Sequence, residues 1–360
     1  MNLRVPGPTP VPEDIRTAGA QQMINHRGPE FAELINSVHS GLQHIFQTKQ
    51  EVSILTASGT GAMEAAVVNS FSPGDKILSI SIGVFGNRFA QIAEIYGAEV
   101  VKPTIPYGSA ADPELIKNEL EKNPSIKGVL VTHNETSTGV TNDIESIAKV
   151  VKSFDKLLLV DAISSLGCIP LPTDEWNCDV VISGSQKGFM VPPGLAFGVQ
   201  SDAALSASKT ATMPRFYFDF ERHTSYYHRG QTPWTPAVSI FYGLDLALKK
   251  MLNEGLANIF TRHEKTATKV RSAVKEIGLK LFAEDEQYAS ITVTSVRIPE
   301  SVDAKRLLGL LRTEHNIVLA GGQADLDGKI FRIGHLGYVE EKEIDEVIEK
   351  LKVVLPEVGF

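Results

Sequence analysis

The sequence has few cysteines, no excess of basic residues and no long apolar run, and each absence excludes a class of protein. Its two cysteines, Cys168 and Cys178, cannot form a disulfide framework for 360 residues, and no CxxC pair suggests a metal site. Asp and Glu number 43 against 35 Lys and Arg, a formal net charge of −8, whereas nucleic-acid binding needs a basic surface. No apolar run could span a bilayer. The first residues also lack the pattern of a signal peptide, so we expect a cytoplasmic protein without nucleic acid, membrane or metal as partner.

The length predicts more than one domain, because 360 residues exceed one ordinary hydrophobic core. Residues 6–12 are rich in proline and glycine and cannot form a helix or a central strand. We therefore predict an extended arm over residues 1–14, a large domain over 15–250 and a small domain over 251–360.

Short apolar runs separated by helical patterns fill the predicted large domain. The expected strands lie near residues 52, 76, 127, 156, 179 and 195, with helices at 61–71, 85–96, 113–122 and 143–154. Nearly continuous apolar strands of this kind imply an α/β fold, with a mainly parallel sheet covered on both faces. After a helical region at 235–277, the pattern changes to a strand at 289–298, a helix at 303–314, strands at 317–320 and 329–333 and a helix at 340–353. This second pattern predicts a smaller α+β domain.

Two side chains that could carry chemistry stand at the ends of expected strands, where ligands bind in sheets of this type. Lys187 follows the strand near 179, and Asp161 ends the strand near 156. A buried lysine has a lowered pKa, which suits an amine that attacks a carbonyl. A carboxylate behind a protonated pyridine nitrogen keeps that ring electron-withdrawing. The alternatives are a surface lysine in a turn and an aspartate that caps the next helix.

Three further segments complete a hypothetical cofactor site. Ser58, Gly59 and Thr60 come directly after a strand and open a helix, a place where phosphate binds, although a simple capped helix start has the same pattern. Phe85 could stack on a ring, or be a core residue. Thr136 could hydrogen-bond a ring hydroxyl, or its own turn. A phosphate site, a buried amine and a carboxylate together suggest pyridoxal 5′-phosphate (PLP).

Arg332 stands inside an apolar strand pattern of the small domain, where a guanidinium needs an anionic partner. Its planar fork could hold the α-carboxylate of an amino acid, or form a structural ion pair with Asp or Glu. A distal acid of a substrate could instead meet Arg215, Arg222 or Arg229.

Several motifs along nearly the whole chain resemble the class V aminotransferases, close to the alanine–glyoxylate and serine–glyoxylate (serine–pyruvate) transaminases. These motifs are PGPTPVP at 6–12, SGTGAMEAA at 58–66, GVFGNR at 83–88, THNETSTGV at 132–140, LLLVDAISSLG at 157–167, SGSQKG at 183–188 and RIGHLG at 332–337. The resemblance implies the PLP-dependent transferase fold type I, with a seven-stranded type of sheet. Some relatives have His in place of Thr60 and Trp in place of Phe85, which bears on the subfamily rather than on the chemistry.

The resemblance also implies a role for each residue of the site. Lys187 would form the Schiff base with PLP and Asp161 would contact the pyridine nitrogen. Ser58, Gly59, Thr60 and Gln186 would bind the phosphate, while Tyr227 and Thr232 would reach it from the neighbouring subunit of a homodimer. Gly7 and Arg332 would border the substrate carboxylate.

The function expected from these roles is a ping-pong transamination between a small amino acid, alanine or serine, and a 2-oxo acid such as glyoxylate or pyruvate, through a Lys187 aldimine. Aminoethylphosphonate and ureidoglycine transaminases remain alternatives within the family. A non-catalytic partner subunit that keeps the fold is the alternative from another class.

Overall fold

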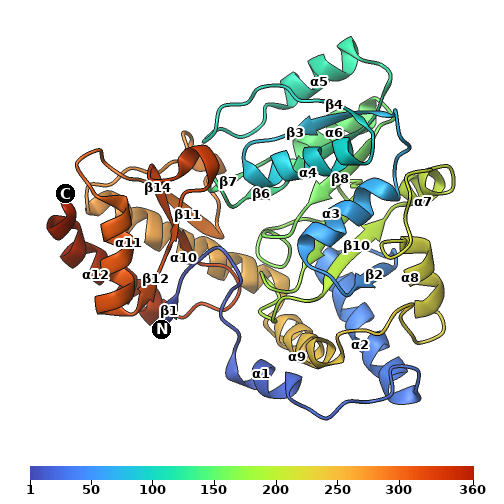
Figure 1. Cartoon of the computed structure of the whole chain (residues 1–360), viewed down its shortest axis with the longest axis horizontal. Helices are drawn as coiled ribbons and strands as arrows, with labels where there is room; N and C mark the ends of the chain where they lie inside the picture. The colour runs from blue at the N-terminus through green and yellow to red at the C-terminus, as the bar shows by residue number, and fades with distance from the viewer.

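The computed structural model describes residues 1–360 as two lobes joined by a long helix (Figure 1). The large lobe is built on a seven-stranded sheet in which every neighbouring pair is parallel except the two pairs made by β10. In spatial order its strands are β2 (Val52–Leu55), β10 (Ala196–Gln200), β9 (Val180–Gly184), β8 (Leu157–Asp161), β5 (Ile126–Thr132), β3 (Lys76–Ile80) and β4 (Glu99–Val101). The prediction of a mainly parallel sheet is confirmed. The edge strand β4 has three residues, none of them fully buried, and so lacks the buried apolar run that marked the others.

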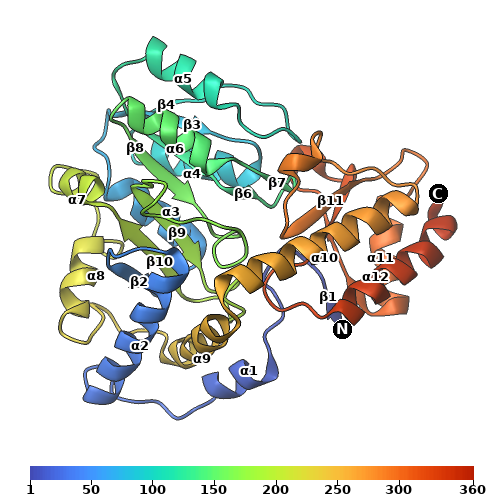
Figure 2. The same ribbon diagram turned by 180° about the vertical axis from the view of Figure 1, so that it is seen from behind.

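Helices cover both faces of this sheet, as the sequence pattern predicted. Helices α3 (Gly59–Val68) and α4 (Val84–Ile95) lie on the face seen in Figure 1, and α5 (Pro113–Lys122) and α6 (Ile144–Ser153) lie on the face seen in Figure 2. Helix α6 shows the local reason: Asp143 caps its start by accepting from Ser146 N, and its apolar residues recur at helical spacing and are buried. The other helices of the lobe are α1 (Glu13–Gly19), α2 (Pro29–Phe46), α7 (Asp202–Ser208), α8 (Phe220–Tyr227) and α9 (Val238–Glu254).

The small lobe has its own apolar core between a three-stranded sheet and two helices. Its sheet has the order β11 (Val293–Arg297), β14 (Ile330–Gly334), β13 (Ala320–Gly321), and its helices are α11 (Ala304–His315) and α12 (Glu341–Val354). Helix α10 (Leu256–Glu276) leads into this lobe. The single helical region expected at 235–277 is thus two helices, separated at Gly255, whose φ of 80° ends α9. The division at residue 250 stays a prediction.

The N-terminal arm connects the two lobes. Its strand β1 (Asn2–Leu3) pairs in parallel with β12 (Ile317–Val318) of the small lobe. Gly334 N donates to Arg4 O at 2.7 Å, and farther along the arm Thr9 N donates to Gln186 O at 3.0 Å in the large lobe. The arm therefore passes over the carboxyl edge of the large sheet, between the lobes.

That edge also carries a short hairpin of β6 (Asn134–Glu135) and β7 (Val140–Thr141), directly after β5. The loops after β8 and β9 end beside it, because parallel strands bring their carboxyl ends to one edge. No helix in the chain combines the length and the apolar character that crossing a membrane requires.

Candidate functional site

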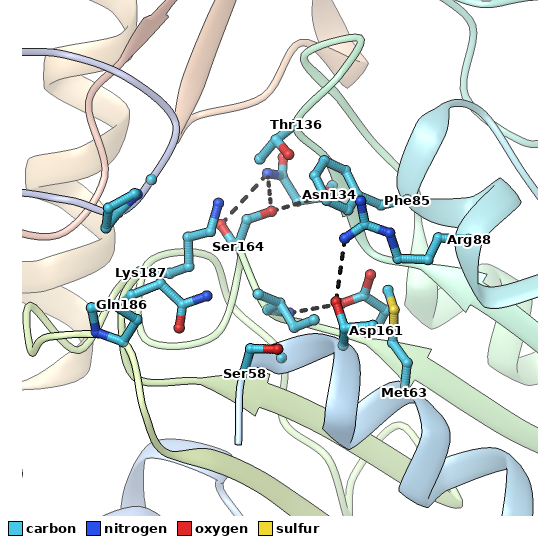
Figure 3. A pocket seen from close by; sticks show the side chains of 16 residues that line it. Ser58, Met63, Phe85, Arg88, Asn134, Thr136, Asp161, Ser164, Gln186 and Lys187 are labelled. Atoms are coloured by element: carbon cyan, nitrogen blue, oxygen red, sulfur yellow. Dashed lines mark hydrogen bonds between the residues drawn. The ribbon is translucent and has the colours of Figure 1, made fainter. Parts of the chain in front are cut away.

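A cavity of about 310 Å³ lies at the carboxyl edge of the large sheet, under the N-terminal arm. Figure 3 shows the side chains around it, which come from α3, α4, the hairpin and the loops after β8 and β9. Nine residues named from the sequence line it: Gly7, Ser58, Gly59, Thr60, Phe85, Thr136, Asp161, Gln186 and Lys187. Residues from six distant parts of the chain thus meet in one place.

Lys187 projects from the loop after β9 into this cavity (Figure 3). Its Nζ donates to Pro6 O at 2.6 Å, and no carboxylate lies within ion-pair distance of it. Burial lowers the pKa of Lys187 to about 8, although the charges of Asp161 and Glu135 oppose that shift. A side chain at Gly7, whose φ is +139°, would place its Cβ 2.6 Å from the Lys187 Nζ. Only glycine lets the arm cross the lysine this closely.

Asp161 ends β8 and is 3% exposed. Its Oδ1 accepts from Ile163 N at 2.9 Å and its Oδ2 accepts from Thr132 Oγ1 at 3.3 Å. No cation pairs with it, and burial raises the pKa of Asp161 to about 7. The bond to Ile163 N is the local turn that the helix-cap alternative described, but the carboxylate also faces the cavity. A protonated nitrogen at this place would restore the charged form.

The N-terminus of α3 forms another wall. Its N-cap residue Ser58 makes no side-chain hydrogen bond to the helix, so the first N–H groups stay available to an anion. The Oε1 atom of Gln186 is buried and has no hydrogen-bond partner in the chain. Arg88 reaches the same wall from α4 and donates to Thr60 Oγ1 at 3.3 Å. The wall therefore combines a helix end, a polar amide and a guanidinium.

Arg332 is 6% exposed and has only neutral partners in the chain. Its Nε and Nη2 donate to Gly321 O at 2.9 and 2.7 Å, and its Nη1 donates to Thr136 O at 3.0 Å and to Gln323 Oε1 at 3.2 Å. The structural ion pair considered from the sequence is absent. Burial lowers the pKa of Arg332 to about 10. Arg332 is not among the residues that line the cavity, but Thr136, which it contacts, is.

Five other residues named from the sequence do not line the cavity of their own chain. The ring of Tyr227 stacks on His39 at 3.9 Å, and Thr232 Oγ1 donates to Trp234 O at 2.7 Å. Arg215 donates to three backbone carbonyls, and Arg222 lies over the ring of Phe216. Arg229 lies over Tyr226.

Sequence reasoning missed several residues of the cavity wall. These are Pro8, Met63, Arg88, Asn134, Ile163, Ser164 and Pro193. Arg88 could have been found, because it follows Phe85 by three positions on one helix and so shares its face. Asn134 stands two residues before Thr136 in an extended hairpin strand, and it donates to Ser164 Oγ at 2.9 Å.

Comparisons with known proteins agree with this geometry. The family described as Aminotransferase class-V matches residues 14–347. A protein named soluble hydrogenase, small subunit, from Synechococcus sp. is 43% identical over 99% of this chain and 94% of its own. A serine–glyoxylate aminotransferase from Methylorubrum extorquens is 37% identical over 94% of this chain and 87% of its own. The structure of an alanine–glyoxylate aminotransferase from Nostoc sp. covers 98% of this chain and 94% of its own, with 32% identity and a TM-score of 0.94.

The lowered pKa of Lys187 predicts a pH-dependent stability of the cofactor-free protein. Between pH 8 and pH 10.5, the ordinary value for lysine, the unfolded chain binds the proton and the folded chain does not, so stability rises with pH in this window. Lys187→Met should therefore stabilise the protein below pH 8, by an amount on the order of a few kcal/mol, and this gain should shrink as the pH approaches 10.5. Thermal unfolding from pH 6.5 to 10 measures it.

The matched control is Lys127→Met, because Lys127 is exposed near the start of β5, at the end of that strand away from the cavity. If Lys187→Met raises the stability by the same amount at every pH in this range, Lys187 is not the buried, destabilised ammonium that we assign.

Proposed function

Because the chain belongs to the class-V aminotransferases, we propose that it transfers the amino group of alanine or serine to glyoxylate or pyruvate. The reaction would proceed in two half-reactions through one site. The proposal is supported by relatives named for serine and for alanine, each with glyoxylate as the second substrate. The single observation that carries it is the buried Lys187 amine, which shares one small cavity with the unpaired carboxylate of Asp161 and the N-terminus of α3.

Pyridoxal 5′-phosphate is the cofactor of this enzyme family, and the residues of the cavity fit it. Asp161 is a buried carboxylate without a cation, which suits a protonated ring nitrogen. The open N-terminus of α3 suits a phosphate group, and Gln186, whose amide oxygen has no partner in the chain, can turn its NH₂ group toward that phosphate. When bound, the cofactor supplies an aldehyde carbon that condenses with amines and a ring that withdraws electrons.

Lys187 is the residue that we propose moves the proton. Its pKa of about 8 keeps an appreciable fraction of the amine neutral near pH 7. A neutral Nζ can take a proton from the substrate Cα and return it to another carbon nearby, as a general base and then a general acid. Asp161 would hold the ring nitrogen protonated from behind. Pro6 O would accept a hydrogen bond from Lys187 Nζ when the amine is free.

The other cavity residues would bind and orient. Ser58, Gly59, Thr60 and Gln186 would hold the phosphate, assisted by the positive end of α3. Phe85 would cover one face of the ring and Thr136 would lie near its hydroxyl.

Arg332 and Gly7 would hold the substrate carboxylate. A buried guanidinium surrounded by neutral carbonyls retains its charge for an incoming anion, and a bidentate pair with a carboxylate would set the orientation of Cα.

Lys187→Ala should abolish transamination, with a loss of at least roughly a thousandfold, because the proton carrier is removed. The purified protein is assayed with alanine, serine or aspartate as donor and glyoxylate or pyruvate as acceptor. In parallel, borohydride treatment followed by peptide mass spectrometry should find a pyridoxyl group on Lys187. Lys127→Ala is the control. Full turnover by Lys187→Ala, or a pyridoxyl group on another lysine, would refute the assignment.

Arg332→Gln should raise the KM for both amino-acid and keto-acid substrates by roughly tenfold to a hundredfold, because charge-assisted hydrogen bonds to the carboxylate are lost. Steady-state kinetics at varied donor and acceptor concentrations measure this. Arg215→Gln is the matched control, since the Arg215 guanidinium also bonds backbone carbonyls but lies away from the cavity. Equal effects of the two variants on KM would show that Arg332 has only a structural role.

We also propose a homodimer with shared sites. Tyr227 and Thr232 do not reach the cavity of their own chain, which supports a role in the partner's site. Near them the exposed ring of Phe216 and the partly buried ring of Trp234 lie under the guanidinium of Arg222, at 5.0 and 5.5 Å. Aromatic residues and arginine of this kind are enriched in protein interfaces.

Mixing two defective variants tests the shared site. Lys187→Ala and Thr232→Ala homodimers should each have low activity, and subunit exchange between them should restore part of it, because one of the two mixed sites regains both residues. Size-exclusion chromatography with light scattering gives the mass of the assembly. A monomer, or no recovery after verified exchange, would contradict the proposal.

A non-catalytic subunit is the second candidate, raised by the hydrogenase name of one relative. Lys187, Asp161 and Arg332 together argue for catalysis, because a structural subunit needs none of these buried charges. Activity of the purified chain alone distinguishes the two.

A further inference from the structure

Glu135 is a fully buried carboxylate beside the site. It is 0% exposed in strand β6, between Asn134 and Thr136, which both line the cavity. No lysine, arginine or histidine forms an ion pair with it. An ionised carboxylate in such surroundings is costly unless hydrogen bonds satisfy its oxygens.

Four hydrogen bonds do so. Glu135 Oε2 accepts from Phe85 N and from Gly86 N, each at 3.0 Å, and Oε1 accepts from Ser137 N at 3.0 Å and from Ser137 Oγ at 2.6 Å. Ser137 Oγ in turn accepts from Val84 N at 2.9 Å. The first three N–H groups of α4 are thus bound by a hairpin 50 residues farther along the chain, and the negative charge faces the positive end of the helix.

The fit between hairpin and helix leaves no free space. A Cβ at Gly83, just before α4, would lie 2.4 Å from Ser137 Oγ and 2.5 Å from Glu135 Cγ. The helix start can approach the carboxylate only because this residue is glycine. The backbone of Phe85, and with it the ring that lines the cavity, is therefore held at a fixed place relative to the hairpin.

The same hairpin touches the substrate side of the site. Thr136 O accepts from Arg332 Nη1 at 3.0 Å, so the residue after Glu135 joins the small lobe to the cavity. Glu135 thus positions Phe85 of α4 and Thr136 of the hairpin. Through the Thr136 carbonyl it also positions the guanidinium of Arg332 from β14.

We propose that Glu135 is a positioning residue of the cofactor site, which fixes Phe85 and Thr136 against the cofactor ring through the N-terminus of α4. The inference rests on the proposed function of this cavity. Other cap residues of this chain act on the helix that follows them directly, as Asp143 does on α6. Glu135 instead acts on α4, which precedes it in the sequence and carries Phe85 into the cavity wall.

The charge of Glu135 also acts on the site. Besides Glu135, the charged groups around the amine of Lys187 are Asp161 of β8, Arg88 of α4 and Arg332 of β14. The negative charges of Asp161 and Glu135 raise the pKa of Lys187, and the two arginines lower it. Removal of the Glu135 charge should therefore favour the unprotonated nitrogen at a lower pH.

Glu135→Gln tests both consequences. The amide keeps the size of the side chain but must turn its NH₂ group either toward the two N–H donors of α4 or toward the N–H and hydroxyl donors of Ser137. We expect the dissociation constant for PLP to rise by roughly tenfold or more. We also expect a weaker circular dichroism band of the bound cofactor, and a downward shift of the pH at which its visible absorption changes. Titration of the cofactor-free protein and pH-dependent spectra measure these without turnover.

Asp179→Asn is the matched control. Asp179 is also buried and accepts from Leu158 N and Ser201 Oγ; it pairs with Lys152 at 2.6 Å and does not line the cavity. This variant should lower the Tm and leave the dissociation constant and the spectra unchanged. If Glu135→Gln folds poorly, Ser137→Ala is the second variant. It removes the hydroxyl's hydrogen bonds to Glu135 and from Val84 N, and should weaken PLP binding severalfold.

The proposal is overturned if Glu135→Gln keeps the PLP affinity and spectra of the wild type, or if its losses only equal those of Asp179→Asn. Unchanged PLP binding by Ser137→Ala would overturn it as well. If the wild-type protein itself binds PLP without a visible band from Lys187, the proposed function fails instead.

Discussion

The structure depends on keeping the amine of Lys187 out of water without a direct ion-pair partner. A buried ammonium is unfavourable, and its pKa falls to about 8 because nothing nearby fully compensates the lost hydration. The backbone carbonyl of Pro6 accepts its hydrogen bond, and two carboxylates act on it from a distance. Each of these groups comes from a different segment, so the fold has to bring an arm, two strand ends and a hairpin together around one atom.

The sequence predicted most of this arrangement because the signals are local. Lys187 and Asp161 follow apolar runs that are long enough to be recognised as buried strands, and parallel strands bring their ends together. Ser58 to Thr60 were found for the same reason, since a strand and a helix flank them. The resemblance added Gln186, Tyr227 and Thr232, whose roles no local pattern indicates. Those roles stay predictions.

What the sequence did not reveal depends on contacts between distant segments. Glu135 lies in a motif that was recognised, but its partners are backbone N–H groups of a helix 50 residues earlier, and a backbone donor has no signature in the sequence. Strand β4 was missed because it is only three residues long and lies at the sheet edge, where none of its residues is fully buried. Arg332 was expected to have either a structural acid or a substrate as partner, and only the folded structure shows that its partners within the chain are neutral oxygens.

The arm has a mechanical consequence. One end is a strand of the small lobe, joined to β12 and to Gly334, and a few residues later Gly7 lies against the Lys187 side chain. Arg332 belongs to that same small lobe. A hinge rotation of the lobe that broke the hydrogen bonds of Thr9 N to Gln186 O and of Arg332 to Thr136 O would therefore withdraw the arm and the guanidinium together. Entry of a carboxylate and its release would then be governed by a single gate rather than by two independent ones.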